Sequence, residues 1–224
     1  MIPKVIYQTW KRELPDRVKG LVAWMRGLNP EYEYRFFDDA AMDAFVKEHG
    51  PKVDDRVWTA YQRLGVGAAR ADLWRYLLMY VWGGIYLDVD SLIVRPLREM
   101  IRGEEEGIVS REGHRGLFVQ WMLVFAPGCR YMRECVIRCV ENILEGESDN
   151  IMEVTGPVMF SRVLVGDGIW ELEDEAASSV LGEGVRVLGV DYEGFGVYHY
   201  SLGRGVDEEL MEGHWSGFRK LRVD

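Results

Sequence analysis

The feature that most constrains the fold is a long helical segment that leads directly into a short strand. Residues 66–82 carry apolar side chains at helical spacing, and Leu73, Leu77 and Val81 belong to the stripe that would be buried. Gly83-Gly84 supplies a left-handed cap that ends this helix. Residues 85–90 then alternate apolar and polar side chains, which is the period of a strand. The sequence therefore predicts a helix and a strand joined by two glycines.

The predicted strand ends in two aspartates, Asp88 and Asp90, which are one residue apart. Residues two apart in a strand point to the same side, so both carboxylates would project near its C-terminal end, where open α/β sheets bind ligands. Two carboxylates aimed at one point repel each other unless a cation lies between them. Mg²⁺ and Mn²⁺ prefer such oxygen ligands and often share them with phosphates. The pattern predicts a metal–phosphate site, and the alternative is a strand-end turn with two solvated aspartates.

The elements on either side of this motif predict an α/β sheet. Strands are expected at Val5–Gln8, Tyr32–Phe37 and Phe118–Phe125, and helices at Val18–Gly27, Ala40–His49, Tyr131–Leu144 and Val158–Val165. The strand–helix–strand–helix order from residue 5 is typical of an α/β fold. No internal repeat or flexible linker interrupts the 224 residues, so one domain over residues 1–224 is expected.

Charge and cysteine content narrow the possible partners and compartments. The net charge of −10 argues against general nucleic-acid binding, which needs a basic surface, and offers no basic patch to an anionic membrane. The three cysteines are an odd number without zinc-like spacing, which favours free thiols in a reducing compartment. No signal peptide is visible, and no apolar run reaches the roughly 18 residues of a membrane span. We expect a soluble protein of the cytoplasm or of a host-cell cytosol, and the oligomeric state stays open.

The helix before the aspartate strand contains a second charged pair, Asp72 and Arg75. They lie three residues apart, hence on one helical face, which differs from the face of Leu73 and Leu77. One interpretation is a surface ion pair worth less than about 1 kcal/mol. The other is a charged pair that reaches a ligand over the edge of the sheet.

Together these residues resemble a known family, glycosyltransferase family 32. Its DXD-containing sugar-transferring region also looks like the catalytic core of the large clostridial glucosylating toxins. The resemblance rests on four blocks: Ala71-Asp72-x-x-Arg75; Gly83-Gly84-x-Tyr86-x-Asp88-x-Asp90 with Pro96-Leu97; Thr155-Gly156-Pro157; and His214-Trp215-Ser216-Gly217. Residues 2–10, IPKVIYQTW, also resemble the family's first strand, IPKxIHQTW, with Tyr7 in place of histidine.

Two departures from the family pattern concern the donor and acceptor contacts. Phe218-Arg219 stands where the family has a terminal Ser-Trp. The family often has an asparagine in the strand before Ala126-Pro127, and here the nearest polar residue is Gln120.

The resemblance implies a GT-A fold, in which helices flank a central mixed, mostly parallel sheet. It also implies a metal-dependent enzyme that uses Mn²⁺ or Mg²⁺ and transfers a hexose-type sugar with retention at the anomeric carbon. The implied donor is a UDP-sugar, although the family includes mannosyltransferases that use GDP-mannose. The implied acceptor is a hydroxyl group of a glycan or a protein.

The resemblance also implies roles for individual residues. Asp90 would bind the metal directly, and Asp88 would contact the ribose or bind the metal through water. His214 would be the third ligand, with an ordinary surface histidine as the alternative. The remaining implied donor contacts are Gln8 and Thr9, Trp10 stacked on the base or else a core tryptophan, Asp72 and Arg75 on sugar hydroxyls, and Tyr86, Gln120 and Trp215. Asp72, Arg75, Asp88 and Asp90 would form the catalytic group.

No convincing pair of carboxylates for a double displacement is visible in the sequence. The mechanistic hypothesis is a front-face substitution through an oxocarbenium-like state, in which the leaving phosphate oxygen takes the proton of the acceptor.

Two other functions compete with a transferase. Residues 86–92 also look like the first motif of haloacid-dehalogenase phosphohydrolases, with Asp88 as nucleophile and Asp90 as general acid, and residues 166–171 imitate their acidic motif. Against this stand the roughly 80 organised residues before the motif and Ser91 in place of the usual Thr or Val. The third possibility is a non-catalytic module that binds a nucleotide-sugar.

Overall fold

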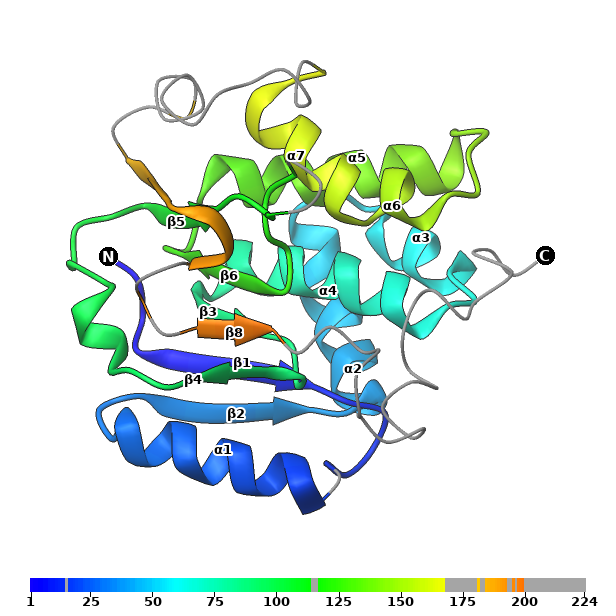
Figure 1. Cartoon of the computed structure of the whole chain (residues 1–224). Coiled ribbons are helices and arrows are strands. Elements are labelled where there is room, and N and C mark those ends of the chain that lie inside the picture. Colours follow the sequence, from blue (N-terminus) through cyan, green and yellow to red (C-terminus); the bar gives the residue numbers. More distant parts are fainter. Residues whose placement is uncertain are drawn as a thin grey trace.

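A six-stranded sheet forms the centre of the computed structural model, which describes residues 1–14, 16–113, 117–167, 181, 184–192, 195 and 197–199 (Figure 1). The strand order is β2-β1-β3-β6-β5-β7. The strands are β1 Val5–Thr9, β2 Glu33–Phe37, β3 Gly84–Leu87, β5 Gly107–Ser110, β6 Met122–Phe125 and β7 Val185–Leu188. Of these strands only β6 runs against its neighbours, which confirms the predicted mixed and mostly parallel sheet.

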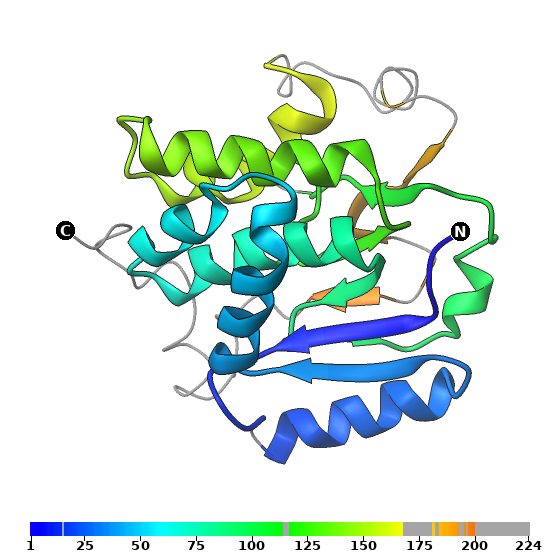
Figure 2. The same ribbon diagram turned by 180° about the vertical axis from the view of Figure 1, so that it is seen from behind.

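Helices cover one face of the sheet, and a short two-stranded sheet lies over the other. The first layer, seen in front of the sheet in Figure 2, holds α2 Asp39–His49, α3 Val57–Arg63, α4 Gly67–Val81, α5 Arg130–Leu144, α6 Ile151–Val154 and α7 Pro157–Val165. On the opposite face lie α1 Asp16–Leu28 and the antiparallel pair of β4 Ser91–Ile93 and β8 Val197–His199. Short 3-10 turns occupy Gly50–Lys52, Leu97–Glu99 and Val190–Tyr192.

The alternation of side chains along β3 divides the core between these two faces. Tyr86 packs into the cluster formed with the helices, whereas Ile85 and Leu87 pack into the cluster on the face of α1 and β4. All three side chains are buried. Because α4 packs between the sheet and α5, it is buried on nearly every side, and its residues Leu73 and Leu77 have no exposed surface. The strand period predicted from the sequence is therefore confirmed at Ile85, Tyr86 and Leu87. The helix is also found where it was predicted, but its burial is not limited to one stripe, because residues 72–79 are all buried.

The diglycine turn has the backbone geometry that the sequence predicts. Gly83 has a φ of +63° and Gly84 a φ of +107°, in the region that side chains other than glycine rarely adopt. The amide of Gly83 donates to the carbonyl of Met79 at 3.1 Å, which ends α4. A Cβ atom on Gly84 would lie 2.8 Å from the carbonyl oxygen of Val5. Glycine is therefore required here both for the turn and for the close approach of β3 to β1.

Most predicted elements are found within two or three residues of their expected bounds. The strand expected at Phe118–Phe125 begins only at Met122, and the strand of the aspartate motif ends at Leu87 rather than at Asp90. The helix α3 was not predicted. In the described part of the chain, no helix has the length and apolar character needed to cross a membrane, and the three cysteines are buried free thiols.

Candidate functional site

A cavity of about 270 Å³ lies at the edge of the sheet where β1, β2 and β3 end. Three segments supply most of its wall: the loop after β1, the first two turns of α4, and the turn after β3. The lining residues are Thr9, Trp10, Lys11, Asp39, Met42, Gly67, Ala71, Arg75, Tyr86, Asp88, Val89 and Asp90. The carboxyl ends of parallel strands are the expected place for a ligand in such a sheet.

Asp88 and Asp90 both line the cavity, but a turn rather than a strand brings them there. Regular pairing of β3 ends at Leu87, and the amide of Ser91 then donates to the carbonyl of Asp88 at 3.0 Å. The amide of Asp88 donates to the carbonyl of Trp121 on the neighbouring chain segment at 2.8 Å, which fixes the start of the turn. The prediction that the period of a strand aligns the two carboxylates was therefore wrong, although both do reach the same cavity.

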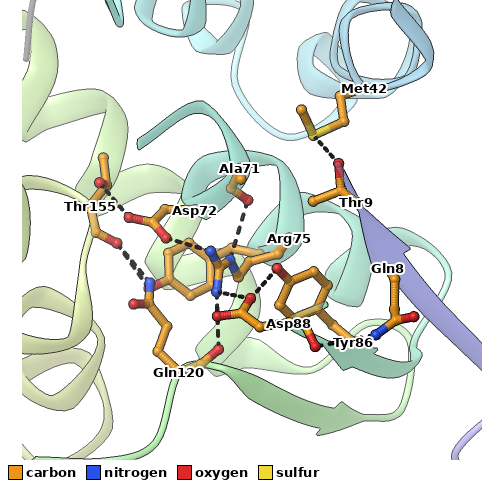
Figure 3. A network of polar contacts seen from close by, with 11 residues as sticks. Gln8, Thr9, Met42, Ala71, Asp72, Arg75, Tyr86, Asp88, Gln120 and Thr155 are labelled. Carbon is orange, nitrogen blue, oxygen red and sulfur yellow. Dashed lines mark hydrogen bonds and ion pairs between the residues drawn. The ribbon is translucent and has the colours of Figure 1, made fainter. Parts of the chain in front are cut away.

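Arg75 on helix α4 contacts two carboxylates, Asp72 on its own helix and Asp88 on this turn (Figure 3). Its Nη2 atom lies 2.9 Å from Oδ1 of Asp72, and its Nη1 atom lies 3.2 Å from Oδ1 of Asp88. Nη1 also donates to the carbonyl of Gln120 at 3.2 Å, and the guanidinium stands 4.6 Å from the centre of the Tyr86 ring. The side chains of Asp72 and Arg75 are each only 8% exposed, so the interpretation as a surface ion pair is wrong.

Burial and charge act on Asp72 in opposite directions. Burial raises the pKa of Asp72 to about 7, against the lowering effect of Arg75 and of a hydrogen bond from Thr155. Burial alone would lower the pKa of Arg75, but the electrostatic effects of Tyr86, Asp88 and Asp72 raise it, so the guanidinium stays charged. Asp72 lies behind Arg75 and is not among the residues that line the cavity.

Tyr86 is a second partner of the Asp88 carboxylate. Its hydroxyl donates to Oδ1 of Asp88, the same oxygen that Arg75 approaches. Burial raises the pKa of Tyr86 well above its ordinary value, so the hydroxyl keeps its proton and remains a donor. Tyr86 and Asp88 thus face each other, and both line the cavity.

Thr9 and Trp10 line the cavity, whereas two other predicted donor contacts, Gln8 and Gln120, lie behind it. Gln8 donates from Nε2 to the carbonyl of Asp88 at 3.2 Å and accepts from the hydroxyl of Tyr34 at 3.1 Å. The Nε2 atom of Gln120 donates to the carbonyl of Thr155 at 3.2 Å. Both amides thus hold the backbone around the site in this structure.

His214 and Trp215 lie outside the described residues, so the structure does not test their predicted roles. Strand β8 pairs antiparallel with β4, and His199 lies opposite Ser91, the residue after Asp90. Strand β8 therefore ends beside the aspartate turn. Among the described residues, no three His, Cys, Asp or Glu side chains are grouped so as to hold a metal ion.

Sequence reasoning missed Lys11, Asp39 and Met42 as cavity residues. Asp38 is the N-cap of α2, and its side chain accepts from the amide of Ala41 at 2.8 Å. Asp39, the first residue of α2, lines the cavity, and burial raises the pKa of its carboxyl group. The sequence signal for Asp39 was an acidic residue directly after the capping aspartate, at the end of a predicted strand.

The geometry agrees with comparisons to known proteins. Residues 15–107 match the model of a family described as glycosyltransferase sugar-binding region containing DXD motif. The predicted family resemblance is confirmed. The match includes the helix α4, the diglycine turn and both aspartates, and it ends at the start of β5.

Two similar curated proteins are named mannosyltransferases. Inositol phosphoceramide mannosyltransferase 3 of Schizosaccharomyces pombe is 39% identical over 103 residues, which cover 45% of this chain and 27% of that protein. Initiation-specific alpha-1,6-mannosyltransferase of Candida albicans is 25% identical over 199 residues, covering 71% of this chain and 51% of the relative. The chain thus spans about half or less of the length of these relatives.

Solved structures confirm the predicted GT-A fold. The PaToxG glycosyltransferase superposes with a TM-score of 0.59 at 19% identity, over 73% of this chain and 69% of that one. The ligand-free glycosyltransferase domain of the YGT toxin gives a TM-score of 0.50 at 11% identity, over 63% and 62% of the two chains.

Proposed function

We propose that this chain is a metal-dependent, retaining glycosyltransferase that moves a hexose-type sugar from a nucleotide diphosphate sugar to a hydroxyl acceptor. The observation that carries the proposal is the convergence of Asp88, Asp90, Arg75 and Tyr86 on one cavity at the carboxyl edge of the sheet. Such an edge is where α/β folds bind nucleotides. We further propose that residues 1–224 form a single catalytic domain.

The acidic turn fits a divalent cation of the magnesium or manganese type. These ions are usually bound through one or two carboxylates together with substrate phosphates, rather than by a full cage of protein ligands. Asp88 and Asp90 provide two carboxylates on one cavity wall, which is the donor set that such an ion needs. When bound, the ion would neutralise charge that develops on the departing diphosphate. Asp90 is proposed as the direct ligand and His214 as a further one.

The cavity also has a wall suited to a nucleoside. Trp10 offers a flat aromatic surface for a base, and Lys11 and Asp39 lie on the same wall. A UDP-sugar is the donor predicted from the resemblance to the toxins, whereas the curated relatives are named mannosyltransferases. UDP and GDP must therefore be compared directly.

Front-face substitution with retention is the proposed mechanism, because the buried carboxylate of Asp72 is not placed to act as a nucleophile. A double displacement needs a carboxylate with a free oxygen at the anomeric carbon. Both oxygens of Asp72 are already used, one by Arg75 and the other by Thr155 at 2.8 Å, and Asp72 does not line the cavity. The proposed role of Asp72 and Arg75 is to bind and orient the sugar hydroxyls through the charged guanidinium.

A thermal-shift panel tests this proposal. Wild-type protein is heated with UDP, GDP or CMP, each with and without MnCl₂. We expect stabilisation that requires both one nucleotide and Mn²⁺, and its loss in Asp90→Asn. The matched control is Asp55→Asn, an exposed aspartate before α3 that does not line the cavity. If Asp90→Asn keeps the metal-dependent shift, the proposed site is wrong.

A donor-hydrolysis assay separates an enzyme from a binding module. The protein that responds to a nucleotide in the thermal panel is incubated with the matching sugar donor and Mn²⁺, and release of free nucleotide is followed. Turnover that disappears in Asp90→Asn supports the transferase. Tight binding with no turnover, with or without simple glycoside acceptors, supports the non-catalytic module instead.

A further inference from the structure

The segment Thr155-Gly156-Pro157 packs directly behind the proposed sugar-binding pair. Thr155 follows the short helix α6, and Pro157 opens α7. Thr155 has no exposed surface, and its side chain points at Asp72 (Figure 3). A buried threonine hydroxyl aimed at a buried carboxylate is a specific polar contact rather than generic packing.

We propose that Thr155 is a positioning residue that holds the carboxylate of Asp72 in the orientation that binds Arg75. The inference rests on the proposed function, because Arg75 is the member of this pair that reaches the donor cavity. Thr155 itself does not line the cavity and would touch neither the sugar nor the metal.

The contacts form a continuous chain from the α6–α7 junction to the acidic turn. Oγ1 of Thr155 donates to Oδ2 of Asp72 at 2.8 Å, while Oδ1 of Asp72 faces Nη2 of Arg75 at 2.9 Å. Because each oxygen has a different partner, the carboxylate cannot rotate without losing one of them. Arg75 then extends to Asp88 at 3.2 Å. The threonine hydroxyl thus sets the position of a guanidinium two contacts away.

The backbone of Thr155 is itself held in place. Its carbonyl accepts from the hydroxyl of Tyr76 at 2.9 Å and from Nε2 of Gln120 at 3.2 Å. Its amide donates to the carbonyl of Ile151 at 3.1 Å. Because both the amide and the carbonyl of Thr155 are hydrogen-bonded, its backbone is fixed and its hydroxyl has a defined position.

The structure explains why glycine and proline follow Thr155 in this segment. A Cβ atom on Gly156 would lie 2.8 Å from Cα of Met152 and 2.9 Å from the carbonyl oxygen of Ile151, so only glycine fits against α6. Pro157 occupies the first turn of α7, where its missing amide proton is not needed. Glycine and proline therefore build the corner that presents the threonine to Asp72.

The hydroxyl also influences the charge of Asp72. A hydrogen bond donated to a carboxylate favours its ionised form. The titratable and charged groups that face Asp72 are Arg75 and Tyr76 on α4, Tyr86 and Asp88 around β3, and Cys139 on α5. With the hydroxyl removed, Arg75 remains the main group that favours the carboxylate, so Asp72 would take up its proton at higher pH and weaken its ion pair with Arg75.

The test compares Thr155→Val, which removes the hydroxyl at nearly constant volume, with Thr155→Ser, which keeps it. The control is Ser110→Ala on β5, because Ser110 is an equally buried hydroxyl that accepts from the amide of Tyr192 at 2.8 Å, away from Asp72 and from the corner at residues 155–157. The carboxyl ¹³C resonance of Asp72, assigned with Asp72→Asn, is titrated in each variant without ligand. Calorimetry with UDP-glucose and GDP-mannose in MnCl₂ then measures donor affinity at pH 7.

We expect the titration midpoint of Asp72 to rise in Thr155→Val and to match wild type in Thr155→Ser and Ser110→Ala. Donor affinity should fall about tenfold in Thr155→Val and recover in Thr155→Ser. An unchanged midpoint in Thr155→Val would overturn the positioning role, whatever happens to stability. If the valine variant does not fold, Thr155→Cys provides the same comparison with a weaker donor. Absence of donor binding in every variant, wild type included, would count against the proposed function and leave the titration result standing.

Discussion

The ion pair between Arg75 and Asp88 joins the most buried helix of the protein to the turn that carries its acidic motif. Nη1 of Arg75 lies 3.2 Å from Oδ1 of Asp88, and the arginine side chain is 8% exposed. The two residues are only 13 positions apart in the sequence. They meet because the diglycine turn reverses the direction of the chain between α4 and β3. One buried cation thus contributes both to the packing of α4 and to the shape of the proposed donor site.

Replacing Arg75 by alanine should therefore reduce stability as well as function. The change leaves the carboxylates of Asp72 and Asp88 without the guanidinium that neutralises them, and loss of one partner of a buried ion pair costs about 3–5 kcal/mol. We expect the free energy of unfolding in urea to fall by about that amount. Arg75→Lys should be intermediate, because an ammonium group cannot hold both carboxylates in the same geometry.

The control for this prediction is Arg138→Ala on α5. Arg138 forms two ion pairs of 3.5 Å with Glu134 and Glu141, but its side chain is 50% exposed. Exposed pairs contribute about 0–1 kcal/mol, so this variant should unfold almost like wild type. Equal losses in the two alanine variants would contradict the importance of burial at Arg75.

Local signals were sufficient to predict the helix α4, the diglycine turn and the strand β3. The helical stripe, the requirement for positive φ and the period of two are all properties of neighbouring residues. The end of the strand was not predictable in this way, because Asp88 and Asp90 continue the alternation after pairing has stopped at Leu87. The turn is closed by the bond from the amide of Ser91 to the carbonyl of Asp88, and its start is held by the bond from the amide of Asp88 to the carbonyl of Trp121, on a distant segment.

The burial of the Asp72–Arg75 pair also lay beyond sequence reasoning. Helical spacing places the two side chains on one face but does not tell what covers that face. The cover comes from Thr155, 83 residues later in the chain. Helix α3 was missed because its seven residues, Val57–Arg63, are too few for a clear helical period. The charged residues of the site were thus predictable from the sequence, whereas their burial depends on contacts with distant segments of the chain.

Removing the aromatic ring of Trp10 should weaken nucleotide binding without unfolding the protein. Trp10 is half-buried, because it packs against the cluster of Val18, Val22 and Val89, and it also lines the cavity, where we propose that a base stacks on it. Stacking of a base on an aromatic ring is worth about 1–3 kcal/mol, which corresponds to a loss of roughly five- to 150-fold in affinity for Trp10→Ala. Trp10→Phe should lose less, and Trp24→Ala, on an α1 residue that is 57% exposed, should bind normally. Calorimetry with UDP and GDP in MnCl₂ measures the effect, and normal binding by Trp10→Ala would assign the tryptophan to the core.

The stability of the protein should depend on pH through Asp72. Burial raises its pKa in the folded state to about 7, above the roughly 3.9 of an unfolded chain, so the folded state holds this proton more tightly. The contribution of Asp72 is therefore greatest below about pH 4, falls as the pH rises toward 7, and is constant above that. Asp72→Asn has no such proton.

Urea unfolding of wild type and Asp72→Asn between pH 4.5 and 8 isolates this effect, because all other groups titrate in both proteins. We expect the free energy of unfolding of wild type, relative to the variant, to decrease with a slope of up to about 1.4 kcal/mol per pH unit. A relative stability that increases over the same range would show that Arg75, rather than burial, dominates the pKa of Asp72.

A methyl group at Gly84 should destabilise the fold strongly, in contrast to one at Gly20. At Gly84 the φ of +107° is unfavourable for alanine, and the added Cβ would lie 2.8 Å from the carbonyl of Val5 and 2.9 Å from the ring of Tyr7. Both obstacles involve the pairing of β3 with β1, so the strand would have to move. Gly20 lies inside α1 with open space around its Cα, where alanine is favoured by about 0.5–1 kcal/mol. Chemical denaturation should therefore show Gly84→Ala as less stable and Gly20→Ala as more stable than wild type.

The same substitution at Gly84 should also affect the proposed site, because β3 leads directly into Asp88. We expect Gly84→Ala to lose its metal-dependent thermal response to nucleotide. If that response survives unchanged, the aspartate turn does not depend on the register of β3.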